Sequence, residues 1–448
     1  MALSIEEIRR KASEQRKKQT IALALLHQNR LRFHSEVVPS TPALASWMYR
    51  GKQREDISPL FAGREGVAQA LTDFLAMVQN LIPKDKFEVF KTLFRFPVIT
   101  NEVLDVCFDK LSRIFDGRNP AFSYQFAATE QRDDWEWYRQ EKLGEPTVWS
   151  TKGWNFFKTQ INSVLIVDLP EEQEAGDRYP QPYFYWLPIR DVIDFKADPT
   201  TGVMEWIMFR QDEDRIAVFD DESYRLFAVK DDMPEGEPIV ENRHDLGYCP
   251  ARFFWSEPMS LQYPDIKRSP VTKELDNLDW FLFFSISKRH LDLYGSYPIY
   301  SGYEQTCDYE NTETGDYCDG GFLKNRQGHY LFDRSGALLP CPKCGSRRIV
   351  GAGSFVEVPV PVEGQPDMRN PVSMLSVDRS SLDYNVDEEK RLREEIITAV
   401  CGQAEEITQR DAFNEQQVRA GFESQTTVLS RIKKGFEAAQ AFVDATVC

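Results

Sequence analysis

Hydrophobic and polar positions follow a helical period through the first third of the chain. Residues 66–82 and 103–114 place apolar side chains three and four positions apart, which predicts two amphipathic helices. Ser4 and Glu7 form a capping-box pattern ahead of an earlier, charged helix. The pattern therefore predicts a mainly helical segment over residues 1–146.

The pattern changes to short runs of β-branched and aromatic residues between residues 147 and 260. Turn-forming residues separate these runs, and nothing in them has a catalytic spacing. The predicted strands are residues 163–167, 183–187, 192–195, 205–210, 215–219, 224–229 and 251–255. They predict an antiparallel meander, so the fold class that we expect is α+β.

A helix is predicted over residues 269–294. Ser269 is a favoured N-cap, proline is favoured at the first helical position, and Gly295 is a plausible C′ residue. Apolar residues lie on nearly all sides of this helix, including Trp280, Phe281, Phe283 and Phe284. A helix of this kind must be buried, either in its own domain or against neighbouring subunits.

An insert separates this helix from a second predicted helix over residues 386–402. The insert ends in an alternating run at 354–362, in which Pro359 and Pro361 confine the predicted strand to a sheet edge. Residues 403–413 are polar and predict a loop, and a capped final helix follows over 414–448. No internal repeat is evident in the sequence.

Chain length and net charge limit the kinds of protein that this chain can be. The 448 residues are enough for roughly three domains, and 42% hydrophobic residues can supply their cores. A net charge of −17 disfavours a DNA-wrapping surface, which needs lysine and arginine. It is compatible with a wall along which DNA passes, because like charges repel. No apolar run approaches the ~20 residues of a membrane span, so we expect no membrane contact.

Four of the eight cysteines lie in the insert. Cys341-Pro-Lys-Cys344-Gly has the spacing of half a zinc knuckle, because both thiolates reach one tetrahedral metal. Cys307 and Cys318 are further apart than a usual ligand pair, although strand pairing can bring them together. His329 is an alternative ligand.

Three outcomes are open for these cysteines: structural Zn²⁺, four unliganded thiols, or a Cys307–Cys318 disulfide. Zinc is favoured because a small insert poor in apolar residues needs a staple. Four protein ligands would close the site, so the metal would be structural and not catalytic. The chain shows no secretory signal, and a disulfide is less expected in a reducing cytoplasm.

Motifs of known catalytic mechanism are missing from the sequence, including Walker A, GxSxG, HExxH and a GxGxxG that opens a helix. The five histidines lack a spacing that pairs them with carboxylates. Adjacent acidic pairs such as Asp220-Asp221 are better explained as solvated faces. We therefore predict that the protein is not an enzyme, although an enzyme of unrecognised type stays open.

The order of these parts resembles that of the tailed-bacteriophage portal protein, or head–tail connector, family. Three local sequences carry the resemblance together with that order: residues 186–194, 244–250 and 382–385 with the helix after them. Two features depart from the family pattern. Portal clips do not generally carry a zinc-like cysteine set, and the chain leaves little room for a crown.

The resemblance implies a portal-like division of the chain. The implied parts are a wing at 1–260 (helical over 1–146, antiparallel β over 147–260), stem helices at 269–294 and 386–402, a clip with the cysteine module at 295–372, a tunnel loop at 403–413 and a C-terminal wing or spine helix at 414–448. The tunnel loop would place Glu405, Glu406, Gln409 and Arg410 in a DNA channel. An ordinary surface loop is the alternative. The apolar stem residues Trp280, Phe281, Phe283 and Phe284 would pack on adjacent subunits.

The implied function is that of a ring at one capsid vertex, through which DNA is packaged and ejected. Rings of this family typically contain about twelve subunits in closed symmetry. The implied partners are other copies of the chain, the major capsid protein, the large terminase, a head-completion or adaptor protein and the double-stranded DNA in the channel. The protein would reside in the virion after assembly in the host cytoplasm. The alternative is a zinc-ribbon-containing nucleic-acid-binding or adaptor protein.

Overall fold

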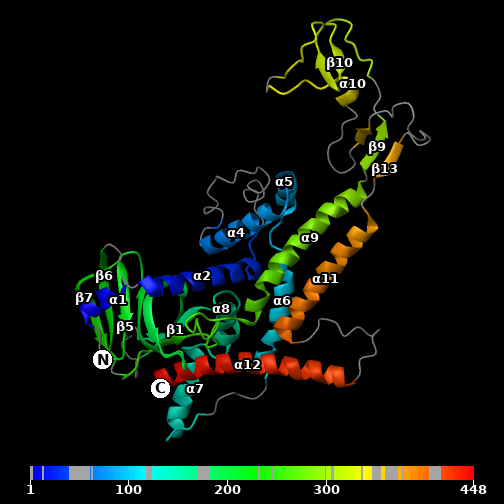
Figure 1. Cartoon of the computed structure of the whole chain (residues 1–448). Helices are drawn as coiled ribbons and strands as arrows, with labels where there is room; N and C mark the ends of the chain where they lie inside the picture. Colours follow the sequence, from blue (N-terminus) through cyan, green and yellow to red (C-terminus); the bar gives the residue numbers. More distant parts are fainter. Residues whose placement is uncertain are drawn as a thin grey trace. The chain divides into compact units, whose positions relative to one another are not determined.

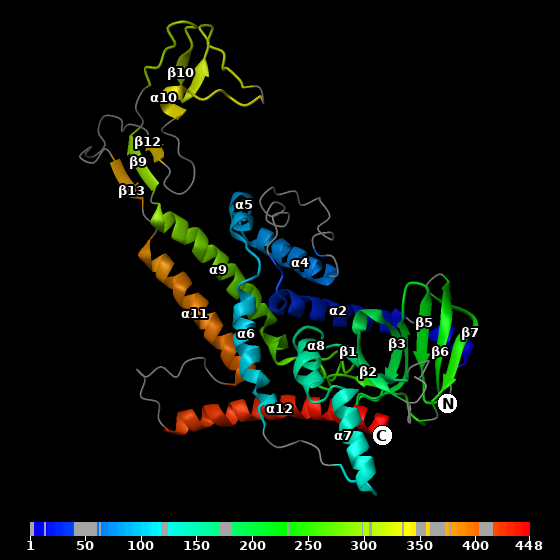
Figure 2. The same ribbon diagram turned by 180° about the vertical axis from the view of Figure 1, so that it is seen from behind.

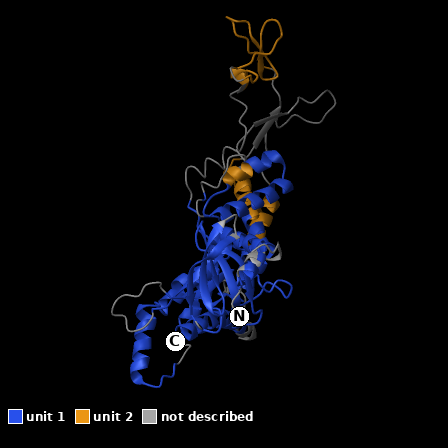
Figure 3. Cartoon of the chain, turned by 90° about the vertical axis from the view of Figure 1, so that its left-hand side faces the viewer, with its two compact units in different colours: residues 1–88, 94–282, 391–448 blue, residues 89–93, 283–390 orange. Residues whose placement is uncertain are grey.

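The structure is a computed structural model that combines helices with mainly antiparallel sheets, as the predicted α+β class requires (Figure 1). It describes residues 4–12, 15–39, 61, 64–117, 124–169, 181–230, 233–244, 246–297, 299–303, 307–333, 336–345, 355–358, 372–375, 378–402 and 415–448. The chain divides into two compact units (Figure 3). Unit 1 contains residues 1–88, 94–282 and 391–448, and unit 2 contains residues 89–93 and 283–390.

Helices dominate the first part of unit 1, as the sequence predicts. They are α1 (Ile5–Ala12), α2 (Gln15–Ser35), α4 (Glu65–Leu81), α5 (Lys84–Leu93, whose last turn belongs to unit 2), α6 (Thr100–Leu111), α7 (Thr129–Glu141) and α8 (Trp154–Thr159), with the long α12 (Glu415–Val447) at the end of the chain. Short helical turns are η2 (Ser112–Phe115), η3 (Trp149–Gly153), η4 (Ile189–Asp191) and η5 (Pro270–Glu274). The predicted capping box is confirmed: Ser4 Oγ accepts from Glu7 N, and Glu7 Oε2 accepts from Ser4 N.

The predicted meander is confirmed for four of its strands, which belong to a five-stranded antiparallel sheet. Its strands follow chain order: β3 (Val192–Ala197), β4 (Met204–Arg210), β5 (Arg215–Phe219), β6 (Ser223–Lys230) and β7 (Met233–Arg243). The other predicted strands form a separate antiparallel sheet of order β2-β1-β8: β1 (Ser163–Asp168), β2 (Tyr183–Pro188) and β8 (Ala251–Phe253). The predicted strand at 251–255 is thus two residues too long.

Two elements of unit 1 depart from the sequence prediction. Strand β7 was not predicted, because Pro234, Gly236 and Pro238 interrupt it. It lies at the edge of its sheet, where proline is tolerated, and the register shift opposite Gly236 accommodates that glycine's positive φ. Residues 149–159 are helical rather than part of a β segment, and they place Trp149 and Phe157 in the core.

Both faces of the five-stranded sheet are buried. On one face, Ile8 of α1 packs into a cluster with Trp206 and Phe227. On the other face, Phe195 and Phe219 belong to a larger cluster that also includes residues of α2, β1 and β8. Strand β4 supplies both clusters alternately, which is the two-residue period of a strand between two layers.

Helix α12 is docked on unit 1 by aromatic packing and lies beside β1 and α8 in both views (Figures 1 and 2). Phe436 is 5% exposed, and its ring meets those of Trp154, Phe157, Phe254, Trp255 and Phe115 at centroid distances of 5.2–6.0 Å. A Cβ at Gly435 would lie 2.4 Å from the Trp255 ring. The glycine therefore permits the close approach of helix and indole.

Helices α9 (Leu275–Ser296) and α11 (Arg379–Cys401) contribute residues to both units. The predicted first helix starts at Ser269 with the 3-10 turn η5, in which Ser269 N donates to Thr272 Oγ1. The predicted stop at Gly295 is wrong, because α9 continues to Ser296. Helix α11 begins several residues before the predicted start, and Gly402 follows it with a φ of 76°, as expected of a C′ residue.

Unit 2 holds the remaining short elements. These are β9 (Ile299–Tyr303), β10 (Tyr317–Asp319), β11 (Phe322–Lys324), α10 (Pro342–Gly345), β12 (Phe355–Val358) and β13 (Val372–Leu375). Strand β12 is parallel to β9 at one edge of a β12-β9-β13 sheet, so the predicted edge strand is confirmed over residues 355–358; Pro359 and Pro361 lie outside the described residues. Among the described residues, no helix is long and apolar enough to cross a membrane.

Candidate metal centre

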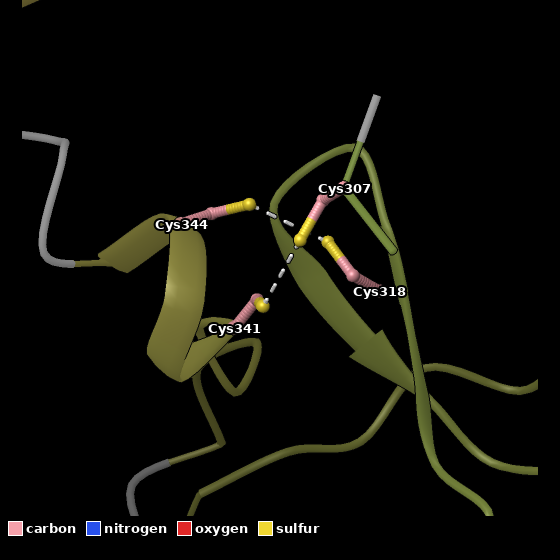
Figure 4. Close-up of side chains that lie close together, drawn as sticks. All are labelled: Cys307, Cys318, Cys341 and Cys344. Carbon is pink, nitrogen blue, oxygen red and sulfur yellow. Dashed lines mark hydrogen bonds between the residues drawn. The ribbon is translucent and has the colours of Figure 1, made fainter. Parts of the chain in front are cut away.

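The four cysteines of the insert come together at one point (Figure 4). All four Sγ atoms lie within 4.8 Å of one another. The Sγ–Sγ distance is 3.9 Å for Cys307 and Cys341 and 3.6 Å for Cys318 and Cys344. Zinc–sulfur bonds of about 2.3 Å in a tetrahedron separate the sulfur atoms by roughly 3.8 Å. The cluster therefore has the size of a four-thiolate metal site.

A β-hairpin closes the long gap between Cys307 and Cys318. Cys318 N donates to Tyr309 O at 3.0 Å, which sets the two chain segments side by side. Asn311 begins the turn: its Oδ1 accepts from the backbone of Glu313 at 2.9 Å. Such Asx turns are favoured locally and do not depend on a distant partner. The predicted strand pairing thus accounts for the unusual ligand spacing.

The second pair of cysteines is placed by a single helical turn. Cys341 N donates to Gly321 O at 2.9 Å, so the start of α10 is tied to the β10–β11 connection. Cys341 and Cys344 are three residues apart across α10, and side chains at that spacing share one helix face. The side chain of His329, the alternative ligand, is exposed and does not belong to the cluster. The four cysteines alone supply the ligands of a tetrahedral site.

The four thiols affect one another's pKa values through hydrogen bonds. Burial raises the pKa of the Cys344 thiol, and hydrogen bonds with Cys307 and Cys318 raise it further. Burial acts in the same direction on Cys307, but hydrogen bonding, first from the Tyr309 backbone, outweighs it and lowers the pKa. Thiolates this close repel one another, so a bound cation is needed for all four to ionise. The donor set fits a divalent metal that prefers sulfur ligands.

No disulfide joins these residues in the structure. All eight cysteines are free, and Sγ–Sγ distances of 3.6 and 3.9 Å far exceed a disulfide bond of about 2.05 Å. The segment around them, residues 307–345, has little apolar core: its only buried hydrophobic side chains among the described residues are Leu323 and Cys341. Cys341, which is 0% exposed, is the more buried of the two. We call this segment the metal module.

The metal module contains an internal repeat, so the expectation of no repeat is wrong. Glycines with positive φ recur every eight residues at Gly320, Gly328 and Gly336. A leucine follows each glycine three residues later, at 323, 331 and 339. The turn residues are equivalent as well: Asn325 Oδ1 accepts from His329 N, and Asp333 Oδ1 from Ala337 N, each at 3.0 Å.

The three repeats close into a ring of hydrogen bonds, which we call the leucine triangle. Leu331 N donates to Leu323 O at 2.9 Å, Leu339 N to Leu331 O at 2.7 Å, and Leu323 N to Leu339 O at 2.9 Å. Isolated bridges 322–340, 324–330 and 332–338 join the flanking residues. In the third repeat Cys341 occupies the position of Asn325 and Asp333, so a cysteine of the cluster replaces the turn residue. The repeat and the cysteine cluster therefore share a residue, Cys341, and form one continuous structure.

The predicted interface residues of α9 differ in exposure. Phe281 is 2% exposed and packs within unit 1, so its side chain is not on the surface. Trp280 is 40% exposed. In unit 2, Phe283 stacks on Phe90 at 5.8 Å, and the Phe284 ring lies 6.4 Å from that of Tyr384. Part of the apolar surface is thus covered by the chain itself, which is one of the two alternatives that the sequence left open.

The predicted channel residues, Glu405, Glu406, Gln409 and Arg410, lie outside the described residues, as does the predicted cap Asn414. Of the acidic pairs, Asp220 is 1% exposed and forms an ion pair with Arg225 at 2.6 Å. This carboxylate is a structural partner of a buried cation rather than a solvated group.

One hydrogen-bonded chain in unit 1 has the residue types of a hydrolytic triad. His34 Nδ1 lies 3.1 Å from Thr100 Oγ1, and His34 Nε2 lies 3.0 Å from Asp279 Oδ1. Sequence reasoning missed it because the three residues are far apart in the chain. His34 and Thr100 are both 0% exposed, so no substrate reaches the hydroxyl in this conformation. The chain anchors the start of α9 to α2 and α6.

No known protein-family model matches the chain, and no curated protein is similar to it in sequence. The functional proposal below therefore rests on the sequence and structure of this chain alone.

Proposed function

We propose that the chain is the portal protein of a tailed phage, a ring-forming channel for DNA at one capsid vertex. The observation that carries this proposal is the arrangement of α9 and α11, two long helices that border an inserted unit. Helix α12 then follows after a short connecting segment. This is the order of stem, clip, stem, tunnel loop and C-terminal helix on which the sequence resemblance rests.

The way in which α9 and α11 are held supports the proposal. In unit 2, Ser285 Oγ donates to Glu389 Oε1 at 2.6 Å, so the two helices pack as a hairpin with the insert at its tip. In unit 1, Arg30 donates to Asp279 at 3.2 Å, and Arg393 lies 3.7 Å from Glu102. Both helices are thus fixed to the α/β body by charged contacts, as a stem that transmits load would need.

The acidic balance of the chain also supports a channel wall. A net charge of −17 keeps DNA from adhering to a surface along which it must move. In this proposal the terminase and the head-completion protein dock on the insert, and the major capsid protein surrounds the body. Residues 403–413 would line the channel, with Arg410 the cation that touches phosphate.

Electron microscopy of the purified full-length protein tests the assembly directly. We expect rings with a central hole. Replacing Trp280 by aspartate should give monomers, because the side chain would bring a charge into an apolar subunit contact. Trp137, which is 55% exposed on α7, offers the same substitution as a control that leaves rings intact. A monomer under all conditions, at virion-like concentration, would exclude the proposal.

The channel assignment has its own test. A phage whose protein has residues 403–413 replaced by a shorter glycine-serine linker should still form rings but should lose retention or packaging of DNA. A linker of the original length keeps the spacing and separates the loss of length from the loss of side chains. If both variants gave virions with full-length genomes, residues 403–413 would be an ordinary surface loop and not part of the channel.

For the metal we propose one structural Zn²⁺ per chain, held by Cys307, Cys318, Cys341 and Cys344. A closed four-thiolate site leaves no open coordination position for substrate, so the metal would shape the module rather than react. Elemental analysis of protein purified without chelator should give about one zinc per chain. Metal-free protein whose four thiols all react with an alkylating agent would contradict this.

The second candidate is a zinc-ribbon-containing adaptor or nucleic-acid-binding protein. The observation in its favour is the exposed aromatic surface of the metal module, where Tyr317, Tyr330 and Phe332 are 38%, 40% and 61% exposed. Such a protein would bind its partner as a monomer and would not form rings. Binding to double-stranded DNA that weakens steeply with salt, in a protein that stays monomeric, would favour it.

A further inference from the structure

Two buried carboxylates meet where the end of α12 packs on unit 1. Glu145 is 3% exposed and Asp444 is 4% exposed. Trp149 Nε1 donates to Glu145 Oε1 at 2.6 Å, and Gln440 Nε2 of α12 donates to Glu145 Oε2 at 2.9 Å. On the next turn of α12, Asp444 accepts a hydrogen bond from the Tyr124 hydroxyl. Both carboxylates therefore belong to the contact between α12 and residues 124–149.

One cation serves both acids. The guanidinium of Arg139 lies 5.6 Å from the centre of the Tyr124 ring and attracts both Glu145 and Asp444. Other titratable groups that face this contact are the Tyr124 hydroxyl and the Cys448 thiol, and burial and Asp444 raise the pKa of that thiol. Tyr248 donates to Thr446 Oγ1 at 3.0 Å, and the Arg252 guanidinium lies 5.8 Å from the centre of the Phe442 ring. Two buried anions with a single cation leave one negative charge uncompensated, which is costly in a poorly solvated site.

We propose that Glu145 and Asp444 form a proton-operated latch, in which Glu145 holds a proton while the end of α12 is docked. Trp149 donates to one oxygen of Glu145, so the proton would sit on the other, Oε2. The Gln440 amide, which faces Oε2, would then turn so that its oxygen accepts the proton's hydrogen bond. When Glu145 loses the proton, its negative charge repels that of Asp444 across the contact. The last turns of α12 are then held less firmly, whereas the aromatic contacts of Phe436 stay in place.

The sign of the pH dependence follows from the shift at Glu145. Burial, with a further contribution from Asp444, raises the pKa of Glu145 from 4.5 to about 7 in the docked state. The docked state thus binds more protons than the released state between these two values, so docking weakens as the pH rises from about 4.5 to about 7. Above that range both states are ionised, and docking changes no further.

Hydrogen exchange of the full-length protein tests the latch. For residues 440–447 we expect the opening equilibrium, corrected for the intrinsic exchange rate, to increase about 20-fold between pH 5.5 and pH 7.5. Glu145→Gln removes the charge but keeps an oxygen for Trp149, so its opening equilibrium should stay low and change far less with pH. Asp444, whose pKa burial also raises, is the carboxyl that still titrates in this variant. Strand β4 is the internal reference, because changes in global stability would affect it as well.

Two further variants make the result decisive. Glu141→Gln is the same substitution at an exposed position of α7 and should behave like the unmodified protein. Asp444→Asn removes the facing anion and should reduce the pH dependence without abolishing it. Equal pH dependence in the unmodified protein and in Glu145→Gln would overturn the latch. If Glu145→Gln fails to fold, an Asp444→Asn variant with unchanged pH dependence would overturn it too.

Discussion

Phe436 of unit 1 is enclosed by five aromatic rings, whereas the metal module between residues 307 and 345 encloses four sulfur atoms. In unit 1, apolar clusters cover both faces of the large sheet, so burial of hydrophobic surface can order the chain. In the metal module, Leu323 is 8% exposed and is joined among the buried hydrophobics only by Cys341 within the described residues. Apolar burial therefore orders the body, whereas the insert depends on local turns and, in our proposal, on a bound metal.

The largest expected effect comes from breaking the metal site. Cys344→Ser should reduce zinc from about one per chain to nearly none, because the site loses one of its four ligands. The module should then lose its order, because structural zinc contributes on the order of 10 kcal/mol to the folding of a small module. Amide protection should disappear from the metal module and remain in strands β4 and β5. Zinc analysis and hydrogen exchange measure the two results, and Cys448→Ser, at an exposed cysteine, is the control. Loss of protection in both regions would mean that the two do not fold separately.

The second prediction removes apolar packing from unit 1 and leaves the metal site unchanged. Phe436→Ala should lower the free energy of unfolding of unit 1 by about 3–5 kcal/mol, because the ring leaves a cavity among its aromatic neighbours. Denaturant unfolding followed by tryptophan fluorescence reports it, since Trp154 and Trp255 lie beside the ring. Phe332→Ala removes the same side chain at a 61% exposed position of the metal module and should leave that transition unchanged. Similar effects of the two variants would show that apolar burial does not distinguish unit 1 from the metal module.

Sequence patterns predicted the body better than the insert, for physical reasons. Helices α4 and α6 and strands β3–β6 carry a strong local period, so tertiary packing only confirms it. Strand β7 has the composition of a loop and is strand only because β6 offers it hydrogen bonds. The first residues of α11, including Ser380, Ser381 and Asn385, are weak helix formers, and contacts such as Tyr384 with Phe284 hold them in place.

The cysteines themselves were predictable, but their relation to the repeat was not. Spacing identified Cys341 and Cys344 as a ligand pair, whereas the approach of Cys307 to Cys318 depends on a hairpin whose register is set by the Asn311 turn. The eight-residue repeat was readable in the glycines at 320, 328 and 336, but three short copies are hard to separate from chance. The latch at Glu145 was not predictable, because its partners are distant in sequence.

A smaller effect is expected from tightening the packing under α12. Gly435→Ala places a methyl group where a Cβ would lie 2.4 Å from the Trp255 ring. The helix or the indole must move, which should cost about 1–3 kcal/mol in the unfolding of unit 1. Gly117→Ala, where a Cβ meets nothing within 4 Å, should stay within about 0.5 kcal/mol. An unchanged transition for Gly435→Ala would show that α12 is not held as closely as the structure has it.

The smallest expected effect distinguishes turn chemistry from metal binding inside the metal module. Gly328 and Gly336 adopt φ values of 81° and 82°, which side chains with a Cβ reach at a cost of roughly 1 kcal/mol. Because zinc binding and folding of the module are coupled, this cost should appear as a severalfold weaker retention of zinc against a chelator.

Equivalence of the repeats makes the last prediction specific. Gly328→Ala and Gly336→Ala should weaken zinc retention by similar factors, although only the second glycine lies in the repeat that ends in a ligand. Asparagine tolerates the left-handed region better than alanine, so Gly328→Asn and Gly336→Asn should each recover part of the loss. Equal losses with partial recovery would assign the effect to backbone conformation in the leucine triangle. A loss confined to position 336 would place the sensitivity at Cys341, and the triangle would then contribute little to holding the metal.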